Sequence, residues 1–144
     1  MDPRFVEYCS SLGLADTLIE RVQWLYSHFA AFSQERIDRI FISDVIKEDR
    51  TREYLNLVLF SLHYVYDAIN FVGAPRVTIS PLRFAHLGYA VSDFDFKSPT
   101  PDSRLFVQGF FHIGGSYSLE LRASGSNCTS LVEVVKQCLM KPLF

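Results

Sequence analysis

The stretch 104–144 constrains the fold of this chain more than any other, because it reads as strand, turn, strand and helix. Hydrophobic and polar residues alternate along 105–113 and again along 117–123, which is typical of strands with one buried face. Gly114-Gly115-Ser116 separates them and predicts a hairpin, since glycine reaches positive φ without steric cost. The stretch therefore predicts an antiparallel sheet.

A closing helix follows this hairpin. Ser130 and Glu133 have the spacing of a capping box, and Pro142 would end the helix. Its apolar stripe consists of Leu131, Val134, Val135, Cys138 and Leu139. We expect this face to pack on the sheet.

Residues 1–35 are predicted to form two further helices. Asp2 can cap the first, with Pro3 at its first position, where a missing N–H costs little, and Gly13 suits its end. Thr17 and Glu20 have the spacing of a second capping box.

The second of these helices, over 17–34, carries one continuous apolar face: Leu18, Val22, Leu25, Phe29 and Phe32. Such a stripe usually faces the core, so we expect it to lie against the sheet. The alternative is a surface for a partner or a second copy, with Trp24 and Phe29 at its centre.

The middle of the chain predicts further strands. A first strand runs over 40–46 and a charged break over 47–53. The apolar run 54–71 fits two strands, with Leu55, Leu57 and Leu59 on one face and a weak turn at 61–63, or a single helix. Its aromatic and β-branched residues favour the strands.

Short strands are also predicted over 76–80, 84–91 and around Phe94 and Phe96. Pro81 limits pairing, which indicates an edge or a bend after the first of these strands.

Composition narrows the class of protein. A chain of 144 residues, 49% hydrophobic and 15% aromatic, is the size of one domain, which we assign to 1–144. A net charge of −2 does not favour nucleic-acid binding. No segment is long and apolar enough for a signal peptide or a membrane span, so we expect a cytoplasmic protein. The three cysteines, Cys9, Cys128 and Cys138, are expected as buried thiols.

No motif indicates catalysis. The four histidines have no metal-ligand spacing, and no nucleotide-binding pattern is present, so we expect no enzyme activity, no metal and no cofactor.

In the order of its elements, the chain from about 39 to 143 resembles the pleckstrin-homology-like superfold, in which seven strands precede one C-terminal helix. The resemblance implies an α+β fold: an antiparallel seven-stranded barrel or strongly bent sheet, capped by the C-terminal helix, with the two N-terminal helices (1–35) as additions. Members that bind phosphoinositides carry basic residues around the first hairpin. Lys47, Arg50 and Arg52 fit that pattern here.

Three functions follow as hypotheses. The first is a non-enzymatic adaptor that binds another protein, or a second copy, through Trp24 and Phe29 or through a sheet edge at Val77 and Ile79. The second is a sensor of anionic lipid headgroups that uses Lys47, Arg50 and Arg52. The third is a small-molecule-binding or enzymatic domain with an aromatic-lined cavity.

Overall fold

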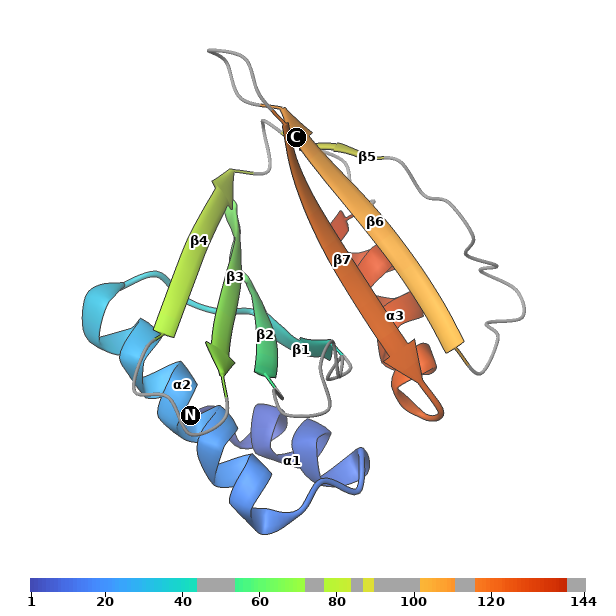
Figure 1. Cartoon of the computed structure of the whole chain (residues 1–144). Helices are drawn as coiled ribbons and strands as arrows, with labels where there is room; N and C mark the ends of the chain where they lie inside the picture. The colour runs from blue at the N-terminus through green and yellow to red at the C-terminus, as the bar shows by residue number, and fades with distance from the viewer. Residues whose placement is uncertain (44–53, 72–76, 84–86, 90–101, 111–115, 140–144) are drawn as a thin grey trace.

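The computed structural model describes residues 1–43, 54–71, 77–83, 87–89, 102–110 and 116–139 (Figure 1). Its helices are α1 (Pro3–Ser11), α2 (Asp16–Phe32) and α3 (Asn127–Val134), and a π-helical turn, Val135–Leu139, continues α3. Its strands are β1 (Arg39–Ser43), β2 (Tyr54–Phe60), β3 (Tyr64–Phe71), β4 (Val77–Arg83), β5 (Leu87–Tyr89), β6 (Asp102–Phe110) and β7 (Ser116–Ser124). The α+β class and the placing of the three helices are as expected from the sequence.

The described strands form two antiparallel sheets, one of four strands in the order β1-β2-β3-β4 and one of three in the order β5-β6-β7. The prediction of a single seven-stranded barrel, or of one strongly bent sheet, is therefore wrong. β1 and β7 meet, but through a side chain: the Arg122 backbone N–H donates to Ser43 Oγ at 2.9 Å. The four-stranded sheet is open.

In a closed barrel, the outer edge of β1 would pair with another strand. Here side chains occupy that edge. The Ile42 N–H donates to Tyr8 Oη at 3.0 Å, the Tyr8 hydroxyl donates to Asn127 Oδ1 at 2.7 Å, and Asn127 Nδ2 donates to the Ile42 carbonyl at 2.7 Å. Tyr8 comes from α1 and Asn127 from α3. Because both outward groups of Ile42 are satisfied in this way, a neighbouring strand cannot pair there.

The four-stranded sheet is the central layer, and its strands β1, β2 and β3 are buried on both faces (Figure 1). Leu55, Leu57 and Leu59 of β2 pack with α1 and α2. Val58 and Phe60 alternate with them and pack with α3 and β7 on the opposite face. The prediction that 54–71 is two strands with Leu55, Leu57 and Leu59 on one face is confirmed.

The first helix begins as predicted. Asp2 caps α1 by accepting a hydrogen bond from the Arg4 N–H at 2.8 Å, and Pro3 is its first residue. Gly13 follows the helix with φ of 70°, a left-handed conformation that glycine adopts without strain.

The second helix covers the sheet with Val22, Leu25 and Phe29, as the stripe predicts. Phe32, at 88% exposed, lies outside that contact. The capping box predicted at Thr17 is wrong, because α2 begins at Asp16 and the Ala15 carbonyl accepts its first hydrogen bonds.

The last helix packs Leu131, Val134 and Val135 against the sheet, as predicted. It begins at Asn127, so the capping box predicted at Ser130 is also wrong. β4 runs through Pro81, and no described strand pairs with its outer side, so the predicted edge is confirmed.

Several predictions fall outside the described residues: the charged break 47–53, the strand around Phe94 and Phe96, the glycine turn and the helix end at Pro142. Within the described residues, no helix combines the length and the apolar character that crossing a membrane requires.

Candidate functional site: a groove at the outer edge of β1

The outer edge of β1 is open at one point. Hydrogen-bonding direction alternates along a strand, and both backbone groups of Ile42 point away from β2. The N–H and carbonyl of Ile40, two residues earlier, therefore point to the same side. In the described part of the chain, no hydrogen bond reaches Ile40 from that side. Ile40 is only 2% exposed, so this donor and this acceptor, in strand geometry, are reached through the cavity that Ile40 lines.

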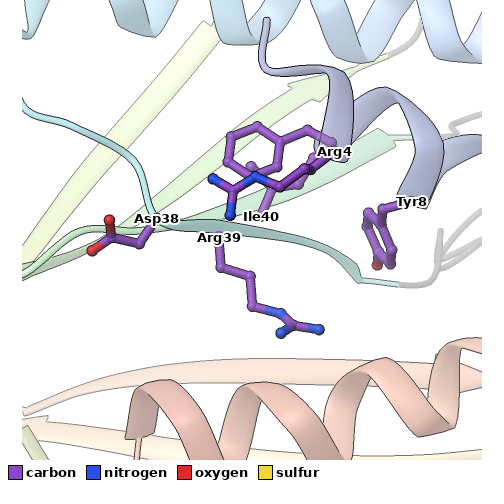
Figure 2. Close-up of a pocket in the computed structure, with 6 residues that line it drawn as sticks. Arg4, Tyr8, Asp38, Arg39 and Ile40 are labelled. Carbon is purple, nitrogen blue, oxygen red and sulfur yellow. The ribbon is translucent and has the colours of Figure 1, made fainter.

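Two adjoining cavities lie along this edge, and together we call them the β1 groove. One, of about 200 Å³, is lined by Arg4, Phe5, Tyr8, Asp38, Arg39 and Ile40 (Figure 2). The other, of about 250 Å³, shares Arg4, Asp38 and Arg39 and adds Phe60, Ser61, Gln137 and Cys138. The groove thus lies between α1, β1, the end of β2 and the turn that follows α3.

Arg39 reaches from β1 across the groove towards α3 (Figure 2). Its Nη1 donates to Gln137 Oε1 at 2.7 Å and its Nη2 to Glu133 Oε2 at 2.5 Å. The side chain is 24% exposed, so its charge is only partly screened by water. Arg39 is therefore the most enclosed cation of the groove.

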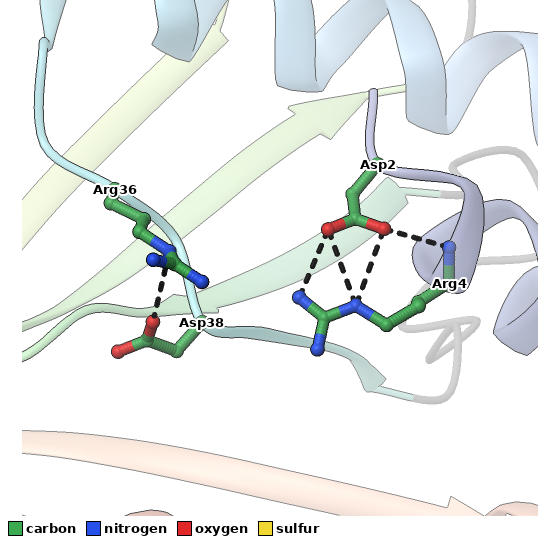
Figure 3. A network of polar contacts seen from close by, with 4 residues as sticks. All are labelled: Asp2, Arg4, Arg36 and Asp38. Atoms are coloured by element: carbon green, nitrogen blue, oxygen red, sulfur yellow. Dashed lines mark hydrogen bonds and ion pairs between the residues drawn. The ribbon is translucent and has the colours of Figure 1, made fainter.

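Arg4 lies on the α1 side, where its guanidinium pairs with Asp2 at 2.9 Å (Figure 3). The side-chain and backbone hydrogen bonds from Arg4 lower the pKa of Asp2, and the side-chain bonds raise the pKa of Arg4. Asp38 faces Arg36 across 3.7 Å. With their partners Asp2, Arg36 and Glu133 included, three guanidinium groups face three carboxylates around the groove, so the charges there balance.

Rigid contacts close both ends of the groove. At one end, Tyr8 is held by the ring of hydrogen bonds with Ile42 and Asn127. At the other, Ser61 Oγ donates to Glu35 Oε1 at 2.6 Å, and the Tyr66 hydroxyl donates to the second oxygen of Glu35. The groove is thus preformed, which lowers the ordering cost of binding.

The two residues predicted to form a partner surface on the second helix lie in different environments. Trp24 is 37% exposed on α2, where His28 packs edge-on to its ring with 4.3 Å between ring centroids. Phe29 is 3% exposed and contacts Tyr66, with ring centroids 4.7 Å apart. Phe29 therefore belongs to the core beneath α2, and only Trp24 is presented to solvent.

The predicted sheet edge lies on the other side of the molecule, at β4. The strand register, followed from Ile42 across the sheet, places the backbone groups of Val77, Ile79 and Pro81 on the side away from β3. Pro81 has no N–H to offer, so it interrupts this edge. Lys47, Arg50 and Arg52 lie outside the described residues.

The sequence analysis did not identify Arg4, Arg39 or Ile40. No motif joins them, because the groove is assembled from segments near residues 4–8, 38–40, 60–61 and 137–138. The available signal was the Asp-Pro-Arg start of α1 and the single Arg39 next to an apolar strand.

The cysteines are present as thiols, and Cys9 and Cys128 are buried as predicted. Burial raises the pKa of the Cys9 thiol to about 11. Across the portion of the chain that the structure describes, no three histidine, cysteine or carboxylate side chains gather as a metal site would require.

Comparisons with protein-family models, with curated proteins and with solved structures find no match for this chain. They therefore identify no pleckstrin-homology-like relative, and the resemblance stays a prediction.

Proposed function

We propose that this chain is a non-enzymatic binding module that takes a short extended segment of a partner protein in the β1 groove. The observation that carries the proposal is the outward N–H and carbonyl of Ile40, which face a preformed cavity. A peptide in strand conformation offers the complementary pair, and two such bonds fix its direction.

The size of the groove favours a short ligand. Its two cavities, about 200 and 250 Å³, each fall below the usual range of about 300–1,000 Å³ for sites that bury a drug-sized molecule. Side chains at Ile42 block further pairing, so a bound segment can add backbone bonds only around Ile40. Recognition therefore depends on a few residues of the partner.

An amide NMR titration with tetrapeptides of alanine, valine and serine, each in an end-capped form and with a free C-terminal carboxylate, tests the proposal. We expect saturable shifts at Ile40, Arg39 and Ser61, because these residues line the groove. Gln137→Trp fills the second cavity and should weaken binding, whereas Lys136→Trp, next to it and outside the groove lining, should not.

Failure of every peptide to shift the groove amides would overturn the proposal. So would equal weakening by Gln137→Trp and Lys136→Trp, because the response would then not depend on the groove.

A further inference from the structure

We propose that the ligand of the β1 groove carries a carboxylate, and that Arg39 and Arg4 bind it together. This inference rests on the proposed function and names the chemistry that the partner segment must present. The source of the carboxylate is either an acidic side chain or the C-terminus of the partner.

Arg39 has unused hydrogen-bonding capacity. A guanidinium has five N–H donors, and Arg39 uses one on Nη1 for Gln137 and one on Nη2 for Glu133. Its remaining donors lie in a groove where water screens them only partly. They can take a carboxylate in addition to Glu133 or in its place.

Arg4 supplies a second guanidinium to the same groove. Its Nε and Nη2 donate to Asp2, which leaves Nη1 with its donors unused among the described residues. Arg4 and Arg39 line both cavities, and they come from different elements. A carboxylate between them would be held from two sides, which gives direction as well as charge.

The acidic residues nearby limit how much negative charge the groove accepts. Asp38 also lines both cavities, and its carboxylate leans towards Arg36, which lies outside the groove lining (Figure 3). Since Asp2 and Glu133 already pair with Arg4 and Arg39, a ligand carboxylate exchanges with one of them, whereas a phosphate dianion would add charge that Asp38 repels. The flat guanidinium fork also matches a carboxylate.

Glu133 acts in this scheme as an internal competitor. It is half-exposed, and exposed ion pairs are weakly held, so a ligand carboxylate can displace it from Arg39. Removing its charge by Glu133→Gln should therefore tighten binding of the carboxylate ligand. Glu133 lies on α3, two residues before the start of the π-helical turn, so displacement would be visible in amide shifts of Val135–Leu139.

The test compares three probe peptides of identical length: acetyl-Ala-Val-Ala with a free C-terminal carboxylate, its C-terminal amide, and acetyl-Ala-Asp-Ala-amide. We expect one carboxylate form to bind about tenfold tighter than the neutral amide, since hydrogen bonds to charged groups are stronger than those to neutral groups. The better of the two carboxylates identifies the source.

Matched variants localise the effect. Arg39→Gln and Arg4→Gln should each reduce the tenfold preference. Lys136→Gln removes the same charge from an exposed side chain outside the groove lining, and should leave the preference unchanged. Far-UV circular dichroism checks that each variant is folded. Arg4, which is largely exposed, tests the inference even where Arg39→Gln fails to fold.

The outcomes separate the two proposals. Equal binding of the amide and both carboxylates at the groove would overturn the carboxylate inference and leave the binding module intact. The same holds if inorganic phosphate binds at Arg39 as tightly as the carboxylate peptide. Failure of all three peptides would overturn both.

Discussion

At the scale of single residues, the Glu35 carboxylate ties the segment between α2 and β1 to the β2–β3 turn. It accepts hydrogen bonds from Ser61 and Tyr66, one on each oxygen. Burial and, secondly, the hydrogen bond to Glu35 raise the pKa of Tyr66 to about 12. Tyr66 therefore serves as a neutral donor, and its ionisation would place two negative charges side by side.

This pKa predicts loss of stability at alkaline pH. Tyr66 holds its proton more tightly in the folded chain, so its contribution is complete below its ordinary pKa of 10 and is lost as pH rises to about 12. Cys9 adds the same effect between 9 and about 11. We expect the free energy of unfolding, measured in urea, to fall increasingly steeply above pH 9.

The variant Tyr66→Phe distinguishes the contribution of Tyr66 to this loss of stability from that of Cys9. It should lose about 1 kcal/mol near neutral pH, since Glu35 loses one donor. Its stability should then decline less between pH 10 and 11 than that of the parent chain. An unchanged slope in this variant would show that Tyr66 does not titrate as the structure indicates.

The sequence predicted the roles of single residues correctly where these depend on the local backbone alone. Asp2, Pro3 and Gly13 all act as expected, because a cap or a positive φ needs no distant partner. The capping box predicted at Ser130 failed where tertiary contacts bear on the start of the helix. Asn127, for example, starts α3 while its side chain bonds to Ile42 and Tyr8.

At the scale of elements, the β2–β3 hairpin shows what a hydrophobic pattern can predict. Strand alternation places Leu57 on one buried face and Val58 on the other. The turn is fixed locally, since Ser61 Oγ accepts the Tyr64 N–H at 3.1 Å. Both faces of the sheet are covered, so aromatic and β-branched composition, rather than polarity, distinguished strands from helix.

The edge strand β4 allows a prediction about self-association. Pro81 points its nitrogen away from β3, so replacing it by threonine adds an N–H to the outer edge. Pro81→Thr should cost less than about 1 kcal/mol in stability, because proline mainly restricts the unfolded chain. It should increase self-association, measured by sedimentation velocity.

Thr78→Val provides the control for this variant. Thr78 pairs with Ile69, and its backbone bonds inwards to β3, so the substitution raises strand propensity without adding an edge donor. Equal association of the two variants would attribute the effect to hydrophobicity rather than to the opened edge.

At the scale of the whole molecule, the expectation of a barrel failed although the strands were largely placed. Strand order along the chain does not show whether the first and last strands can pair. Here Tyr8 and Asn127 occupy the outer edge of β1 at Ile42, and Ser43 meets β7 through its hydroxyl. These contacts join residues up to 119 positions apart, so no local pattern could reveal them.

The same contacts created the β1 groove, which explains why the candidate site was missed. A closed barrel would have paired Ile40 with another strand and left no cavity there. The site is therefore a consequence of the open sheet and could be found only from the assembled structure.

The ring of Tyr8, Ile42 and Asn127 should also couple the two faces of the sheet. Tyr8 belongs to the helix layer on one face and Asn127 to the helix on the other. We expect Tyr8→Phe and Asn127→Ala each to cost about 1–3 kcal/mol, because each leaves a buried Ile42 backbone group without a partner. In the double variant the losses should not add, with a coupling of about 0.5–3 kcal/mol.

Urea unfolding measures these free energies by two probes, the fluorescence of Trp24 on α2 and far-UV circular dichroism of the whole chain. Ser11→Ala is the control, since the Ser11 hydroxyl donates to the Tyr8 carbonyl on the exposed side of α1, and its loss should stay within about 0.5 kcal/mol. Strictly additive losses would mean that the ring does not act as a unit. Separate transitions by the two probes would mean that α2 and the rest of the fold unfold independently, which the ring is expected to prevent.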